Sequence, residues 1–193
     1  MRVLRPVCAV GFLALLAGPA LAQERFATVD VRAGYTTPTG EAGDMLKGQS
    51  SFGGGIAIAL GERLHLGLTA DWAHHSEKPV IGGALDRQWN LLHSFVKIDF
   101  DVVQGEKFTL GLNAGPGMIV FSPNQVLKDA TGVRTDAHFA GNVGTTFTWW
   151  FNPRIGLMGS AQADIALKKT DGQIFTEKQA VFFPLTGGFK FKI

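Results

Sequence analysis

The residues best suited to chemistry are the consecutive His74, His75, Ser76 and Glu77. A histidine can act as general base towards a serine nucleophile. The four residues close a segment of alternating apolar and polar residues, and neighbours on a strand point to opposite faces. His75 and Ser76 would meet only if the chain curled away from the strand, so we expect no catalytic site. The histidines at 65, 74 and 75 form no closed ligand set, so we expect no metal site either.

A second group of candidates consists of charged or titratable side chains on the polar positions of alternating segments. In a narrow barrel these side chains would point into the lumen, where charges of both signs pair. We expect them to form a polar network that replaces a hydrophobic core. The alternative is a narrow pore whose selectivity they set, although eight strands usually leave no continuous channel. The network would contain Asp30, Arg32, His65, Asp71, His93, Lys97, Asp99, Asp164, Lys190 and Lys192.

A run of three glycines, Gly53-Gly54-Gly55, is a candidate for a phosphate-binding loop. It lacks the following Lys-Ser/Thr and the helix that a phosphate-binding loop requires. Small residues that allow close packing or strand bending explain it better. We expect no cofactor.

Eight segments with a period of two must position these side chains. An amphipathic helix would repeat at i, i+3 and i+4, which these segments do not. Lengths of about ten residues or slightly more suit tilted strands that cross a bilayer. Pro116 would weaken an ordinary central strand, so we expect a bulge or bend there, near the barrel rim. The predicted strands are 26–36, 51–60, 64–73, 90–102, 108–120, 137–151, 155–167 and 181–193.

The links between these segments alternate between short and long. The short ones are 61–63, 104–107 and 152–154, and the long polar ones are 38–49, 75–87, 122–135 and 168–178. Short periplasmic turns and long extracellular loops are typical of outer-membrane barrels. The pattern predicts an all-β fold: an eight-stranded antiparallel up-and-down transmembrane barrel with four extracellular loops and both termini in the periplasm. Residues 23–193 would form this single domain.

The N-terminus has the features of a secretion signal. Arg2 and Arg5 precede an apolar stretch over 7–17, and Ala20-Leu21-Ala22 is a small-x-small cleavage site. The stretch is too short for a membrane-spanning helix, which needs about 20 residues. We expect residues 1–22 to be a signal peptide, cleaved after Ala22, and the mature protein to reach the outer membrane of a Gram-negative cell.

Cleavage would change the charge and the thiol content. It removes two of the 18 basic residues and none of the 16 acidic ones, so the mature net charge is close to zero. A neutral chain is unsuited to nucleic acid, which demands a basic patch. Cleavage also removes Cys8, the only cysteine, so disulfides and thiol chemistry are excluded.

The composition of the two faces distinguishes a membrane barrel from a soluble one. A lipocalin-like barrel has an apolar interior and a charged exterior. Here the apolar face carries Leu, Ile, Val and Phe, and the other face carries mostly Gly, Ala, Thr, Ser and Asn with a few charges. That second face suits a tight lumen. Aromatic residues gather near both ends of the segments, as membrane interfaces select.

The chain resembles the small outer-membrane β-barrel families typified by OmpA-like, OmpX-like and OmpW-like proteins. The resemblance spans the mature chain, although its motifs are loose. Family members usually end in an aromatic residue that the assembly machinery reads, whereas this chain ends in Ile193, with Phe191 two residues earlier. The residues that carry the resemblance are Gly141-Asn142-Val143-Gly144, 147–151, Asn152-Pro153-Arg154, 155–167, Gly115-Pro116-Gly117 and Gly187-Gly188-Phe189-Lys190-Phe191.

The resemblance implies a non-enzymatic protein with a structural or surface-interaction role through its extracellular loops. One alternative is a small porin-like channel or carrier for small or hydrophobic solutes. Another is a lipid A-modifying acyl hydrolase or transferase, since some such barrels place His, Ser and an acid near the outer rim. The expected partners are outer-membrane lipid, lipopolysaccharide and, through the C-terminal strand, the assembly machinery, with no nucleic acid. We expect a monomer.

Overall fold

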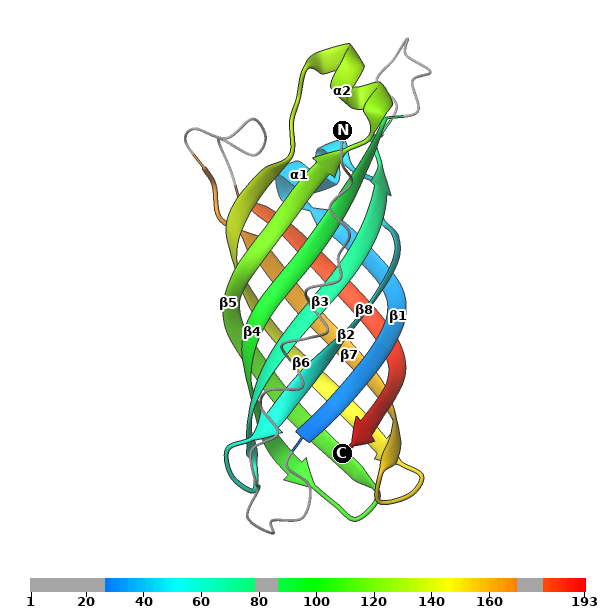
Figure 1. Cartoon of the computed structure of the whole chain (residues 1–193), viewed down its shortest axis with the longest axis vertical. Coiled ribbons are helices and arrows are strands. Elements are labelled where there is room, and N and C mark those ends of the chain that lie inside the picture. The colour runs from blue at the N-terminus through cyan, green and yellow to red at the C-terminus, as the bar shows by residue number, and fades with distance from the viewer. Residues whose placement is uncertain (1–26, 79–86, 170–178) are drawn as a thin grey trace, which may run out of the picture.

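Eight strands close into one antiparallel barrel in the computed structural model, which describes residues 27–78, 87–169 and 179–193 (Figure 1). Each strand pairs with its neighbours in the chain, and β1 pairs with β8. The predicted eight-stranded up-and-down barrel is therefore confirmed. The proposed signal peptide lies outside the described residues. The strands are β1 (Ala27–Thr39), β2 (Gln49–Ala59), β3 (Leu64–Ser76), β4 (Gln88–Gln104), β5 (Phe108–Pro123), β6 (Asp136–Trp150), β7 (Ile155–Ala166) and β8 (Ala180–Lys192).

The alternating sequence turns the apolar side chains outward. On β3, Leu68 is 54% exposed while Asp71 is only 7% exposed. Every strand likewise has large apolar side chains on its exposed outer face. An apolar exterior around a partly polar interior is the arrangement that lipid selects, and the reverse of a soluble barrel.

The two ends of the barrel differ. At the turn end, three short links join β2 to β3, β4 to β5, and β6 to β7, and the C-terminus lies there too (Figure 1). The long links are at the opposite loop end. Two of them contain short helices that the sequence patterns did not predict, α1 (Gly40–Met45) and α2 (Gln125–Thr131). Residues 79–86 and 170–178 of the other two lie outside the described residues.

Local sequence explains the position of α2. The Asn124 side chain caps its first turn by accepting a hydrogen bond from the Leu127 amide at 2.9 Å. Gly132 ends it with a φ of 70°, a left-handed conformation that glycine adopts without strain. No helix in the described part of the chain is long and apolar enough to cross a membrane.

The bulge expected at Pro116 is absent. Phe95 pairs with Gly117, and Ile98 pairs with Ala114, in an unchanged register across the proline. Pro116 still pairs with Gly141 on β6. The missing N–H interrupts the pairing with β4 locally but inserts no extra residue. The register shift between β4 and β5 lies instead at 101–103, near the turn end.

Candidate functional site

The lumen has three levels between the loop end and the turn end. An apolar layer lies under the loops, two clusters of paired polar side chains occupy the middle, and an open cavity lies at the turn end. We call these the apolar layer, the paired clusters and the vestibule. The ten side chains predicted for the lumen all lie in the last two levels.

The first paired cluster centres on the guanidinium of Arg32. Its Nε donates to Asp71 Oδ1 at 2.8 Å and its Nη2 donates to Asp71 Oδ2 at 2.6 Å. Its Nη1 donates to Asp30 Oδ1 at 3.1 Å. Arg32 and Asp71 are both buried, so this two-point pairing compensates charges that have left water.

Gly53 makes the first cluster possible. Arg32 lies on β1 and Asp71 on β3, and both are register partners of Gly53 on the intervening strand β2. A Cβ atom at Gly53 would lie 2.2 Å from Asp71 Oδ1 and 2.4 Å from the Ala70 carbonyl oxygen. The glycine therefore lets Arg32 reach over β2 to its partner. This assigns a structural role to part of the three-glycine run.

The second cluster crosses the lumen from β4 to β6 and β7. Asp164 lies 2.8 Å from the Nδ1 atom of His93 and also accepts a hydrogen bond from Asn142. The Lys97 ammonium donates to Gln162 Oε1 at 2.5 Å, and Asn142 donates to the same oxygen at 2.9 Å. All five side chains are buried. The cluster links β4 to β6 and β7 through side chains that lie inside the lumen.

The apolar layer lies on the loop side of Lys97 and adjoins the second cluster, since Ile119 is the register partner of His93 and Phe182 that of Asp164. Its core consists of Leu91, Phe95, Ile119, Phe121 and Phe182, none of them more than 3% exposed. Ala42 of α1 and Leu127 of α2 join the same cluster, so both helices cap the lumen. The result is a water-excluding closure at the loop end.

This layer was not predicted, because small and polar residues were expected to line the whole lumen. One signal was present: Leu91 and Phe95 broke the alternation of the predicted fourth strand by falling on its polar face. The structure explains the break, since both side chains point inward. Phe182 gave the same signal, because it falls on the polar face of the predicted strand 181–193, between Val181 and Phe183.

Three buried histidines bound the apolar layer, and the ring of one of them, His138, meets the Phe121 ring edge-on at 5.2 Å. His75 Nδ1 lies 2.8 Å from the Lys47 carbonyl oxygen, and its ring lies 6.0 Å from that of Phe182. The His93 ring meets the same Phe182 edge-on at 5.2 Å. Phe182 is thus a packing partner shared by the His75 and His93 rings.

The structure does not join the residues of the His-His-Ser-Glu run into a catalytic unit. His74 Nδ1 lies 2.8 Å from Asn90 Oδ1, whereas His75 is buried inside the barrel. Glu77 accepts a hydrogen bond from Trp89 Nε1 at 2.9 Å. No hydrogen bond joins Ser76 to either histidine within the described ranges. Among the described residues, no three His, Cys, Asp or Glu side chains lie together in a group that could hold a metal ion.

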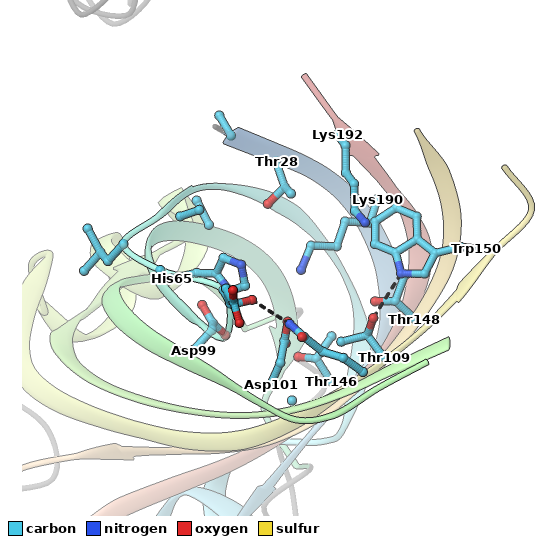
Figure 2. A pocket seen from close by; sticks show the side chains of 18 of the residues that line it. Thr28, His65, Asp99, Asp101, Thr109, Thr146, Thr148, Trp150, Lys190 and Lys192 are labelled. Carbon is cyan, nitrogen blue, oxygen red and sulfur yellow. Dashed lines mark hydrogen bonds between the residues drawn. The ribbon is translucent and has the colours of Figure 1, made fainter. Parts of the chain in front are cut away.

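The vestibule is a cavity of about 740 Å³ bordered by the short links of the turn end. His65 and Asp99 point into it from β3 and β4, and Lys190 points into it from β8 on the facing wall (Figure 2). Threonines on β5 and β6 line the wall between them. The paired clusters lie further towards the loop end, since Asp71 follows His65 along β3 and Lys97 precedes Asp99 along β4.

The charged side chains of the vestibule differ from those in the middle of the barrel in their pairing. His65, Asp99 and Lys190 make no hydrogen bond or ion pair with any described residue. Lys192 is the exception among the four predicted network residues here, because its ammonium lies 3.9 Å from the centre of the Trp150 ring. Of the ten predicted residues, the structure therefore joins six in two clusters and leaves three facing open space.

Comparison with known proteins places the fold. No family model matches the sequence, and no curated protein matches it. The structure is similar to Neisserial surface protein A, with a TM-score of 0.59 and 13% identity over 86% of this chain and 97% of that one. It is also similar to the outer membrane protein OprG from Pseudomonas aeruginosa, with a TM-score of 0.55 and 13% identity over 90% and 99%.

A third similar structure is Ail, the attachment invasion locus protein of Yersinia pestis, in complex with the heparin analogue sucrose octasulfate. Its TM-score is 0.51, with 10% identity over 88% of this chain and 100% of that one. At these identities the likeness concerns the fold alone. The chain has the fold of the small eight-stranded barrels found in outer membranes.

Proposed function

We propose that this chain is a non-enzymatic integral outer-membrane protein that acts at the cell surface through its loop end. The observation that carries the proposal is the closure of the lumen at two successive levels. The Arg32–Asp71 pair and the second cluster fill the middle, and the apolar layer under α1 and α2 seals the loop end. A barrel closed in this way provides no pore, and its loops are the part that can contact other molecules outside the cell.

The exterior supports placement in a membrane. Large apolar side chains are exposed on all eight strands, and aromatic rings lie towards both ends. Phe52 is 59% exposed near the loop end, and Trp149 is 45% exposed near the turn end. A water-soluble protein would leave no such continuous apolar belt, whereas lipid and lipopolysaccharide would cover it.

Cysteine labelling tests placement and orientation together. Removal of residues 1–22, which we propose as the signal peptide, leaves a chain without cysteine. Lys128→Cys would place one thiol on α2 at the loop end, and Glu106→Cys would place one at the turn end. In intact cells a membrane-impermeant maleimide should label the first variant and not the second, and both proteins should fractionate with outer membranes. Recovery of the protein in the soluble periplasmic fraction, or labelling of Glu106→Cys alone, would contradict the proposal.

N-terminal sequencing of the same outer-membrane protein tests the processing. Cleavage after Ala22 predicts Gln23 as the first residue. An uncleaved N-terminus would contradict the proposed signal peptide without affecting the barrel.

A further inference from the structure

The vestibule has the chemistry of a binding site. Its volume of about 740 Å³ falls within the range of cavities that hold small molecules, roughly 300 to 1,000 Å³. It is lined by groups that donate and accept hydrogen bonds as well as by charges of both signs. We propose that it binds a short peptide with free amino and carboxyl termini, entering from the turn end.

The charged side chains in the middle of the barrel are paired, whereas Asp99 and Lys190 of the vestibule are not. In the middle of the barrel, Arg32 has two carboxylate partners and Lys97 has the Gln162 amide oxygen. These groups serve the fold. In the vestibule, Lys190 and Asp99 come from strands on facing walls, and no ion pair joins them. Half-buried charges without protein partners are available to a ligand or to water.

The acidic and basic side chains of the vestibule come from different walls. Asp99 and Asp101 lie on β4, beside His65 of β3. Lys190 extends from β8 towards them across the cavity (Figure 2). An ammonium group fits the carboxylate wall and a carboxylate fits Lys190, so one ligand that carries both groups would satisfy both walls at once.

Threonine side chains line the wall between these charged groups. Thr109 and Thr148 are register partners on β5 and β6, and Thr146 is the next inward residue on β6. Thr148 is 2% exposed and Thr146 Oγ1 already accepts a hydrogen bond from Asn113 Nδ2 at 3.2 Å, but the hydroxyls of Thr109 and Thr146 can still donate to peptide carbonyl groups. Trp150 already donates its indole N–H to Thr109 Oγ1 at 3.1 Å, which orients that hydroxyl. A row of hydroxyls between an acidic and a basic wall matches the backbone of a peptide better than a single amino acid.

The test is a titration of the purified barrel, in detergent micelles, with tri-alanine. Selective ¹⁵N labelling of the tryptophan indoles gives four reporters, and Trp150→Phe identifies the signal from the vestibule. We expect a saturable shift of the Trp150 signal, with those of Trp72 and Trp89 unchanged because both lie near the loop end. Absence of a saturable Trp150 shift would overturn the proposal.

Variants of the two walls test the assignment of charges. Lys190→Met and Asp99→Asn should each weaken tri-alanine binding by about ten-fold or more, which is the effect of one lost charge-assisted contact. Lys128→Met, on α2 at the other end of the barrel, is the matched control and should bind as wild type. Unchanged affinity in both wall variants would overturn the proposal.

Modified peptides give a second test that does not depend on variants folding. On the wild-type barrel, tri-alanine acetylated at its N-terminus, or amidated at its C-terminus, should bind about ten-fold more weakly than the free peptide, and the doubly blocked peptide should show no saturable shift. Equal binding of free and doubly blocked peptides would contradict recognition through the two termini. This inference does not depend on the role proposed for the loop end.

Discussion

Arg32 and Asp71 form a two-point ion pair that passes over an intervening strand, at the position where Gly53 has no side chain. The two N–O distances are 2.8 and 2.6 Å, and both partners are buried. The pair links β1 to β3 across β2, independently of the backbone ladder. The ion pair between β1 and β3 therefore depends on the absence of a side chain at Gly53 of β2.

The role of Gly53 predicts an effect of adding one methyl group. Gly53→Ala places a Cβ against Asp71 Oδ1 and the Ala70 carbonyl, and the backbone atom cannot move aside easily. We expect a loss of about 1–3 kcal/mol in the free energy of unfolding, measured by urea titration of the barrel in lipid vesicles. Gly141→Ala is the matched control, because a Cβ there meets nothing within 4 Å. Similar stability of the two variants would show that Gly53 is not needed for the pairing.

The Arg32–Asp71 pair predicts a non-additive double-mutant cycle. Asp71→Leu leaves the buried Arg32 with Asp30 alone, so we expect it to lower the free energy of unfolding by about 3 kcal/mol. Arg32→Met should also destabilise, since it leaves two carboxylates without a cation. The double variant should cost less than the sum of the single ones, because the second replacement removes an uncompensated charge. Additive losses in the same urea titration would contradict direct pairing.

The apolar layer predicts opposite behaviour of two adjacent phenylalanines. Phe182 is fully buried in the lumen, and Phe183 is 46% exposed on the outer face. Phe182→Ala should leave a cavity and cost about 3–5 kcal/mol of unfolding free energy. Phe183→Ala should cost clearly less, because no enclosed cavity forms. A larger loss for Phe183→Ala would mean that the strand faces the other way.

The burial of His75 predicts no acyl-transfer chemistry at the loop end. Its Nδ1 atom is engaged with the Lys47 carbonyl oxygen, and no described hydrogen bond connects it to Ser76. Mass spectra of lipid A from cells that produce the wild type, His75→Ala, Ser76→Ala or no protein should therefore be identical. A lipid A species that depends on Ser76 would overturn the non-enzymatic proposal in favour of the hydrolase or transferase alternative.

The strands could be predicted from the sequence because apolar and polar residues alternate along each of them. Every predicted segment corresponds to a strand, and the boundaries agree within three residues. The differences are mostly at the loop end, where β1, β3 and β5 continue beyond the apolar belt. There polar residues such as Thr37 and His75 stay in the ladder although the alternation of apolar residues has ended.

The interior was less predictable because pairing depends on register between strands. The sequence indicates that Arg32 and Asp71 share a face, but only the register places Gly53 between them. Likewise, inward-facing Ile119 and Phe121 of β5 meet Phe182 of β8 only because the closed barrel brings these two strands to face the same part of the lumen. The bulge expected at Pro116 was wrong for a related reason: an interrupted ladder need not shift its register.

Conductance across a planar lipid bilayer tests the closed lumen most directly. The purified barrel is inserted from vesicles in which heat-modifiable migration confirms that it is folded. We predict no stepwise conductance, because the paired clusters and the apolar layer leave no continuous water path between the two ends. Reproducible conductance steps of the wild-type protein would contradict the closed lumen and support the small-channel alternative.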